Sequence, residues 1–315
     1  MADHTTDVTT DETHEHHTHH PGEREVGALD AVPPGPAGAP AAKGSGPLAR
    51  AARTARLVGP PAAVFAVILA VWYAISYGVL SEDRRFLLPP PHAVIDQGFL
   101  AAEARGEILA SLWVSTEVAL IGLAIAFVLG SVLAILMSQA NWIERSLYPY
   151  AVFLQTVPIL ALVPVMGFWF GFGTTSRITV CVIIALFPLI INPLKGLLDA
   201  DRGLHDLLTM GGASRWTRLV KLQIPTAMPD VFTGLQTAAG LSVVGAVVGD
   251  FYFGRGEIGL GLLLSRYSSR LQSEEMLATV FVACALGIVV FWLFGALGRR
   301  SVGRWNEAWG TRSRH

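Results

Sequence analysis

The first candidates for chemistry in this chain are a few polar side chains and prolines within its long apolar runs. Gln155 and Thr156 precede Pro158 in one run, and Asn192 precedes Pro193 in another. A proline inside a helix leaves a backbone carbonyl without its usual partner, so a neighbouring side chain, a water molecule or a bound solute must donate to it. We expect such groups to line a cavity, and the candidates are Gln155, Thr156, Pro158, Asn192, Ser242 and Asp250.

Taken singly, each of these positions also fits ordinary helix packing, in which small and polar side chains bond across helices. Asp250 stands at the end of its run, as Glu117 does, so a place at the membrane interface is the alternative for both. No charged residue lies deep inside a run, which argues against a relay of buried carboxylates for protons or sodium ions.

A second group of candidates lies in the moderately polar segment 195–230, between two apolar runs. Asp206 gives an acidic start to a short helix, Gly211-Gly212 marks a tight turn, and residues 213–223 can form a second helix that Pro225 stops. This elbow suits docking into a groove of a partner, and an amphipathic elbow at the membrane interface is an equal alternative. The candidate contact residues are Asp206, Leu207, Leu208, Gly212, Ala213, Ser214, Arg215, Trp216 and Pro225.

The usual catalytic motifs are absent from the sequence. It contains no G-x-x-x-x-G-K-[ST] loop for phosphates, no H-E-x-x-H for zinc and no G-x-S-x-G for a serine nucleophile. We therefore expect neither enzyme activity nor a cofactor in this chain. Imidazole suits divalent metals, but an acid-rich tail is the better interpretation of the N-terminal histidines, so we predict no metal site at His4, His14, His16, His17, His19 and His20.

The elements that position these residues follow from hydropathy. Hydrophobic residues make up 52% of the chain and charged residues 15%, against about 25% charged in soluble domains. A bilayer core about 30 Å thick needs roughly 20 apolar helical residues. The sequence thus predicts an all-α membrane protein with six transmembrane helices, at 58–80, 118–137, 147–172, 178–194, 231–249 and 276–298. Arg177 and Lys195 bound the shortest run, and we expect their side chains to reach outward to the interface.

Six spans place both termini on one side of the membrane, and the basic residues indicate which side. Lysine and arginine gather before the first run, between the fourth and fifth, and after the last, as Arg53, Arg215 and Arg300 illustrate. The positive-inside rule makes this face cytoplasmic, so we expect a plasma-membrane protein with both termini and the elbow in the cytoplasm. A net charge of -1 leaves no overall basic field to hold nucleic acid.

Composition also divides the chain. Residues 1–57 are rich first in acids and histidine and then in Pro, Gly and Ala, which predicts a disordered cytoplasmic tail. Residues 58–300 form the expected transmembrane domain, and residues 301–315 a short basic tail. Cys181 and Cys284 stand in separate apolar runs, so we expect no disulfide framework.

The elbow resembles the cytoplasmic signature of permease subunits in binding-protein-dependent ABC importers: E-A-A, three residues, Gly, nine residues, then I-x-L-P. Asp206-Leu207-Leu208, Gly212, Leu222, Ile224 and Pro225 stand at those spacings, with Asp-Leu-Leu in place of Glu-Ala-Ala. Further stretches are similar to the nitrate/sulfonate/taurine-type subgroup, namely residues 86–91, 155–158 with 169–173, Phe187-Pro188 with Asn192, and residues 259–261.

The resemblance implies a permease subunit that forms the pathway of an ATP-driven importer for a small solute: a sulfonate, taurine, nitrate or a pyrimidine-like vitamin precursor. It implies a second permease copy in a homodimer, two ATPase subunits that carry ATP and Mg and dock on a coupling helix within the elbow, and an extracytoplasmic binding protein that delivers the solute. The alternative is a secondary transporter or channel that works without ATP. A membrane enzyme is the third interpretation, and the missing catalytic motifs argue against it.

Overall fold

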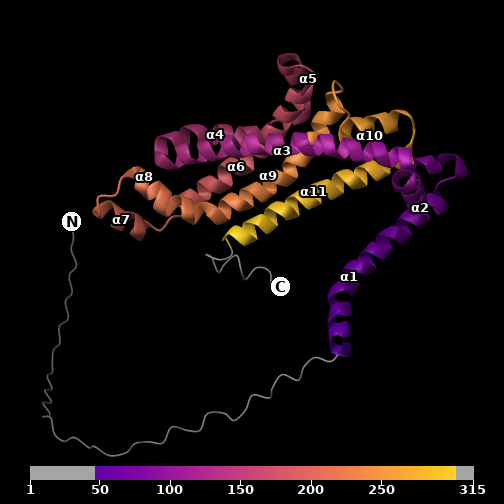
Figure 1. Cartoon of the computed structure of the whole chain (residues 1–315), viewed down its shortest axis with the longest axis horizontal. Helices are drawn as coiled ribbons and strands as arrows, with labels where there is room; N and C mark the ends of the chain where they lie inside the picture. The colour runs from indigo at the N-terminus through magenta and orange to yellow at the C-terminus, as the bar shows by residue number, and fades with distance from the viewer. Residues whose placement is uncertain (1–46, 303–315) are drawn as a thin grey trace, which may run out of the picture. The chain divides into compact units, whose positions relative to one another are not determined.

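Long helices account for the architecture of this protein (Figure 1). The computed structural model describes residues 47–302, with side chains from residue 59 onward, and no strand forms within that range. The chain divides into two units, Met1–Pro60 and Pro61–His315. Residues 1–46 and 303–315 lie outside the description, and with them most of the two predicted tails. Helix α1 begins at Pro47, ahead of the predicted boundary at residue 58.

The described elements follow one another with short connections. Before the long α3 come α1 (Pro47–Ala74), the π-helix η1 (Ile75–Val79), the 3₁₀-helix η2 (Glu82–Leu87), α2 (Pro91–Ala93) and the π-helix η3 (Val94–Leu100). The remainder comprises α3 (Ala102–Gln139), α4 (Asn141–Thr156), α5 (Ile159–Phe170), α6 (Thr174–Leu198), α7 (Arg202–Met210), α8 (Arg215–Arg218), the π-helix η4 (Leu219–Gln223), α9 (Ile224–Tyr252), α10 (Leu260–Ser269) and α11 (Ser273–Val302).

Five helical stretches within the described residues are long and apolar enough to cross a membrane: Gly59–Val79, Ala102–Gln139, Thr174–Leu198, Arg215–Tyr252 and Ser273–Val302. The first lies within the predicted run 58–80, and each of the other four contains one predicted run. The predicted third run, 147–172, is not a straight helix, because α4 and α5 are bent by 100° at the break between them. Counting that pair as one broken span gives six.

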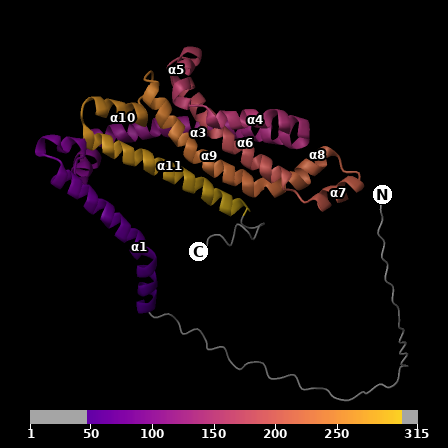
Figure 2. The ribbon, with the colours of Figure 1, turned by 180° about the vertical axis from the view of Figure 1, so that it is seen from behind.

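Helices α3, α6 and α9 pack around a common core, which α11 covers from the side of α9 (Figures 1 and 2). Small residues allow this close approach. A Cβ added at Gly245 of α9 would lie 2.9 Å from the Cα of Cys181 in α6, and one at Gly234 would lie 2.7 Å from the carbonyl oxygen of Pro188. Only glycine lets the backbones of α6 and α9 approach so closely at these two levels.

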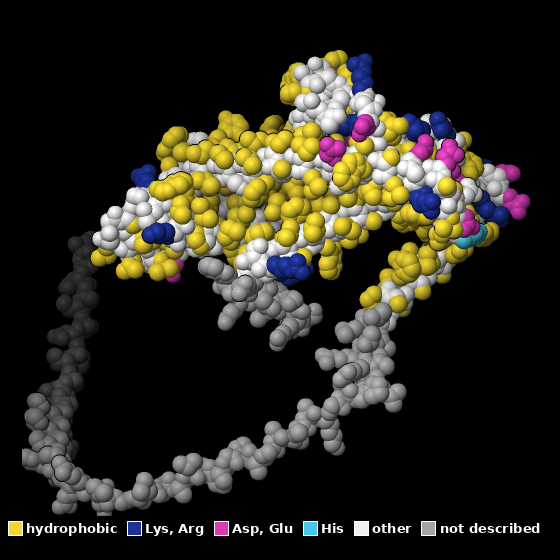
Figure 3. Space-filling model, viewed as in Figure 1, with side chains coloured by type: hydrophobic (Ala, Val, Ile, Leu, Met, Phe, Trp, Pro, Cys, Tyr) yellow, Lys and Arg dark blue, Asp and Glu magenta, His cyan; other side chains and the backbone are white. Residues whose placement is uncertain are grey.

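The bundle has two distinct ends. Helices α7 and α8 form one end, which we call the elbow end, and α10 with η3 lies at the opposite, far end (Figures 1 and 2). Figure 3 shows that apolar side chains cover the long side between the two ends, while most acidic side chains on this face gather at the far end. Apolar sides with charged ends suit a bilayer whose hydrocarbon core surrounds the middle of the helices.

Candidate functional site

The elbow, residues 201–225, begins with a capped helix. The side chain of Asp201 accepts a hydrogen bond from the backbone N–H of Leu204 at 3.1 Å, and its own backbone is not helical. The prediction that Asp206 starts this helix is wrong, because α7 begins at Arg202 and Asp206 lies in its middle. Asp201 performs the capping instead, since only a residue before the first turn can accept from the unpaired N–H groups there.

The predicted tight turn is present at Gly211-Gly212. Gly212 has a φ of +74°, which non-glycine residues rarely adopt. The N–H of Ala213 donates to the carbonyl of Leu208 at 2.9 Å, and that of Gly212 donates to the carbonyl of Thr209 at 3.0 Å. This pair of hydrogen bonds is the Schellman arrangement, which satisfies the last carbonyls of α7 and reverses the chain.

The second helix of the elbow does not end at Pro225, contrary to the prediction. Ser214 caps α8 by accepting from the N–H of Thr217 at 3.2 Å, and the chain then continues through η4 into α9. Residues Arg215–Tyr252 therefore count as one candidate span. Pro225 is tolerated because it occupies the first turn of α9, where the missing N–H is not needed and the preceding π-turn changes the hydrogen-bonding register.

The elbow exposes an apolar patch, which we define as Leu204, Leu207, Met210 and Trp216. Leu207 is 66% exposed, Met210 88% and Trp216 71%. The guanidinium of Arg218 donates to the hydroxyl of Thr209 at 2.5 Å and so joins α8 to α7. The arrangement is a short, internally bonded element with a hydrophobic surface at the end of a membrane bundle.

The other predicted contact residues surround this patch. Asp206, Gly212, Ser214, Arg215 and Pro225 are exposed, whereas Leu208 and Ala213 are partly buried. Their identity as contact residues stays a prediction, because no partner chain is present.

Two of the predicted cavity residues line the same cavity of about 540 Å³. Gln155 at the end of α4 and Asn192 in α6 face it, together with aliphatic side chains, Phe187 of α6 and Thr237 of α9. The amide nitrogen of Asn192 donates to the carbonyl of Pro188 at 3.0 Å, which leaves its amide oxygen free to accept. No charged residue lines this cavity. It can therefore offer amide hydrogen bonds within apolar walls.

The break between α4 and α5 lies beside this cavity. The N–H of Val157 still donates to the carbonyl of Phe153 at 3.1 Å, but Pro158 has no N–H and begins a new helix. Thr156 and Pro158 are exposed at the break, although neither lines the cavity. Non-helical backbone at membrane depth is stable only against other protein or a water-filled space.

Ser242 and Asp250 lie apart from that cavity and are fully buried. Ser242 donates to the carbonyl of Ala239 in its own helix at 2.9 Å, and not across helices as the packing alternative expects. Asp250 forms an ion pair with Arg177, whose Nη1 lies 3.3 Å from Oδ1 of Asp250. The outward reach expected for Arg177 is wrong, because antiparallel packing of α6 and α9 buries its side chain against that of Asp250.

Sequence reasoning did not predict that Arg177 pairs with Asp250, and it did not single out Ser115, whose hydroxyl donates to Asp250. One signal was available. When two successive apolar runs pack as antiparallel neighbours, the start of the first lies beside the end of the second. A basic residue at that start and an acid at that end are therefore brought together.

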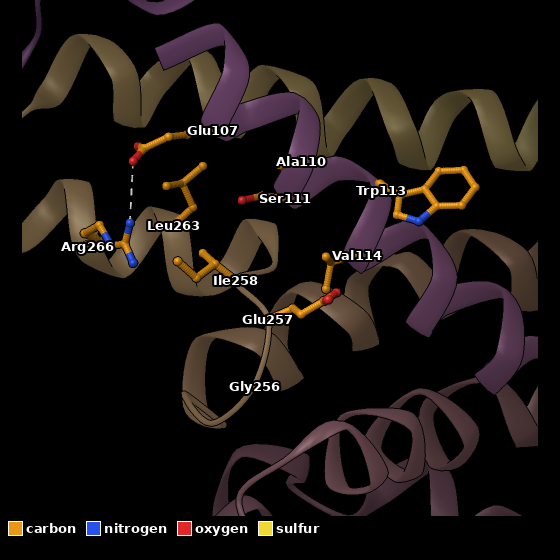
Figure 4. Close-up of a pocket in the computed structure, with 10 residues that line it drawn as sticks. All are labelled: Glu107, Ala110, Ser111, Trp113, Val114, Gly256, Glu257, Ile258, Leu263 and Arg266. Atoms are coloured by element: carbon orange, nitrogen blue, oxygen red, sulfur yellow. Dashed lines mark ion pairs between the residues drawn. The ribbon is translucent and has the colours of Figure 1, made fainter. Parts of the chain in front are cut away.

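A further groove of about 700 Å³ lies at the far end between α3, the loop before α10, and α10 itself (Figure 4). Arg266 on one wall pairs with Glu107 on the other, at 3.6 Å, and Tyr267 beside it donates to Glu107 at 2.7 Å. Burial, and then the Glu107 carboxylate, raise the pKa of Tyr267 well above its usual range, so this hydroxyl stays protonated and keeps donating at physiological pH.

The six N-terminal histidines lie outside the described residues, so the absence of a metal site there stays a prediction.

Comparison with known proteins gives a consistent picture. Residues 126–302 match the family described as "Binding-protein-dependent transport system inner membrane component". The chain is 31% identical to the formylaminopyrimidine transport permease protein ThiX of Halalkalibacterium halodurans, over 73% of this chain and 90% of that protein. It is 31% identical to the putative aliphatic sulfonates transport permease protein SsuC of Escherichia coli, over 77% of this chain and 90% of that protein. It is 28% identical to the nitrate import permease protein NrtB of Leptolyngbya laminosa, over 79% of this chain and 90% of that protein.

Proposed function

The chain belongs to the binding-protein-dependent transport system inner membrane components, the permease subunits of ABC transporters, and from this premise we propose that it forms the transmembrane pathway of an ATP-driven importer for a small solute. ATP hydrolysis takes place on separate subunits, since the sequence has no phosphate-binding loop. An extracytoplasmic binding protein delivers the solute, and a second copy of this chain completes the pathway.

The apolar patch of the elbow is the observation that carries this proposal. A surface made of Leu207, Met210 and Trp216 in water is unfavourable unless another protein or the bilayer covers it. Methionine and tryptophan are enriched where proteins dock, and exposed arginines border the patch. We assign this surface to the ATPase subunit, with Gly212 holding the two short helices at the angle that the partner recognises.

The elbow end is cytoplasmic in this proposal. The basic residues of the elbow, Arg202, Arg215, Arg218 and Lys221, lie at that end, and the last turn of α11 carries Arg299 and Arg300. The positive-inside rule places such residues in the cytoplasm. With α4 and α5 counted as one crossing, both termini then lie on the cytoplasmic side.

The solute pathway runs past the α4–α5 break. The cavity with Gln155 and Asn192 and the exposed break at Thr156 and Pro158 supply hydrogen-bonding groups in an otherwise apolar setting. Non-helical backbone within the membrane must lie against water, solute or protein. The break between α4 and α5 therefore faces the solute pathway or the second copy of the chain. We assign no part in this pathway to Ser242, which bonds within its own helix, or to Asp250, which is buried beside Arg177.

Transport follows from a change in population between two states of the bundle. When the ATPase subunits close on ATP, they displace the elbow, and this rigid movement favours an outward-open over an inward-open arrangement. The solutes named for the relatives, which include an aliphatic sulfonate, nitrate and formylaminopyrimidine, indicate a small polar cargo.

The test is co-purification of the ATPase subunit of the same transporter, together with solute uptake. The variant Leu207→Glu with Met210→Glu places charge in the patch, and we expect at least about a tenfold loss of ATPase co-purification, with uptake lost in parallel. The matched control is Leu271→Glu, an exposed leucine at the far end. Normal co-purification by the double variant, or uptake by the chain without any ATPase, would contradict the proposal.

A further inference from the structure

A buried ion pair joins the two helices that flank the elbow. Arg177 lies in the first turn of α6 and Asp250 in the last turn of α9, both at the far end, and their side chains are 1% and 0% exposed. Placing two charges inside a membrane bundle carries a desolvation cost that their attraction barely offsets. Apolar residues of similar size would hold the helices together at least as well. The pair must therefore supply something other than adhesion.

The guanidinium of Arg177 also donates hydrogen bonds to backbone carbonyls, and these bonds indicate its role. Its Nε and Nη2 donate to the carbonyl of Phe253 at 3.0 and 2.6 Å, Nη1 donates to that of Glu257 at 2.8 Å, and Nη2 to that of Arg255 at 3.3 Å. A single guanidinium thus holds three carbonyls of the non-helical loop 253–259. Its planar fork of donors makes this possible, and no other side chain offers the same geometry.

Asp250 extends the same network to α3 and α10. The hydroxyl of Ser115 in α3 donates to Oδ2 of Asp250 and accepts from the N–H of Leu260 at 2.8 Å. A Cβ at Gly259 would collide with the Asp250 carboxylate, and one at Gly261 would collide with the carbonyl of Val247. These two glycines let α10 begin directly against α9. The loop is therefore fixed at both of its ends.

The same two helices are also tied together at the elbow end. Lys195 of α6 pairs with Asp230 of α9 at 3.8 Å, and a Cβ at Gly196 would lie 2.8 Å from the Cα of Ala227. Between the two ends lie the close approaches at Gly234 and Gly245. Helices α6 and α9 thus stay in contact along their whole length, with the elbow at one end and the loop at the other.

We propose that Arg177 and Asp250 are positioning residues that clamp α6, α9 and the loop 253–259 into one rigid lever, so that displacement of the elbow moves the loop at the far end. This inference rests on the proposed function only for the source of the displacement. The lever itself is a property of the isolated chain.

The test uses a paired variant, Arg177→Met with Asp250→Leu, which removes both charges and leaves no unpaired one. Replacement of a buried pair by apolar residues usually preserves the fold. Hydrogen exchange is measured on the purified chain at the amides of Arg255, which donates to the carbonyl of Phe172, and of Leu260. We expect about tenfold faster exchange at both, with exchange in the middle of α3 unchanged.

The functional readout is the amount of solute taken up per ATP hydrolysed, in membranes that contain the ATPase subunits. The lever predicts that the paired variant still hydrolyses ATP but takes up severalfold less solute for each ATP. The matched control is Arg270→Met, which removes an exposed arginine just after α10 and should leave both readouts unchanged. Wild-type exchange in the paired variant, or fast exchange with wild-type uptake per ATP, would overturn the lever.

A second variant decides the matter if the paired one does not fold. Arg177→Lys keeps the charge beside Asp250, but one ammonium cannot reach the carbonyls of Phe253, Arg255 and Glu257 together. We expect intermediate exchange and intermediate uptake per ATP, and wild-type values for both would refute the role of the loop contacts. Because exchange needs no partner, an absence of uptake by the wild-type chain would count against the proposed importer and leave the lever standing.

Discussion

At the scale of single residues, Gly212 shows how one backbone angle sets the shape of the elbow. Its φ of +74° costs a residue with a β-branched side chain about 1–2 kcal/mol. A residue that cannot adopt this angle must open the Schellman turn and change the direction in which α8 leaves α7.

We therefore expect Gly212→Val to insert normally in the membrane but to reduce both ATPase binding and uptake. Membrane abundance, co-purification of the ATPase subunit and uptake are the measurements. Gly211→Ala is the matched control, because Gly211 has a φ of −72° that alanine adopts without strain. Equal defects in the two variants would show that the turn conformation is not what the partner requires.

The residues of the elbow were partly predictable. The position of Gly212 follows from a local rule, since a helix that reverses direction commonly ends on a glycine with positive φ. The start of α7 was misplaced because two acids, Asp201 and Asp206, stand close together, and sequence alone does not decide which precedes the first turn. The Arg177 contacts join residues about eighty positions apart, and no local rule reveals such a pairing.

At the scale of elements, the break between α4 and α5 has a chemical cause. Pro158 cannot donate to the carbonyl of Leu154, and its ring disfavours a helical conformation at Val157, which is extended with ψ 126°. Pro164 inside α5 produces no comparable break, because α5 continues through it. The bend of 100° therefore depends on the local sequence around residues 157 and 158.

A residue with a backbone N–H at position 158 should allow the helix to continue from α4 into α5. We expect Pro158→Ala to favour a continuous helix from α4 into α5, to change the exposure of Gln155 and to lower uptake severalfold at normal membrane abundance. Labelling of a Gln155→Cys variant with a water-soluble thiol reagent, with and without Pro158→Ala, measures the change. Pro164→Ala is the control and should leave labelling and uptake near wild type.

The helices were easier to predict than their ends. Hydropathy located five helices that are long enough to span, and its third run corresponds to the bent pair α4 and α5, because burial in lipid demands about 20 apolar residues whatever the tertiary contacts. It underestimated α3, whose 38 residues extend past the apolar part into a polar section at the far end. It also missed the continuity from α8 through η4 to α9, since a π-turn before a proline leaves no mark in composition.

At the scale of the whole molecule, the residues to which we assign the proposed mechanism fall within the predicted transmembrane domain, residues 58–300. The elbow, the cavity and the residues of the lever network all lie between residues 115 and 261. Residues 1–46 of the predicted tail lie outside the described range, so their part in transport stays a prediction.

Deletion of residues 1–46, with Arg50, Arg53 and Arg56 retained as orientation signals, should leave insertion and uptake nearly intact. Uptake normalised to membrane abundance is the measurement. A clear loss of uptake at normal abundance would assign a regulatory or metal-sensing role to the tail.

The contact between Gly245 and Cys181 gives the molecule an internal reporter. Cys181 is fully buried between α3, α6 and α9, whereas Cys284 is exposed on α11, so the natural chain carries one accessible thiol and one shielded thiol. A bundle that rocks as rigid bodies keeps Cys181 shielded in every state, while one that separates α6 from α9 uncovers it. The number of thiols that a membrane-permeant reagent modifies during turnover, one or two, thus distinguishes the two kinds of motion without any substitution.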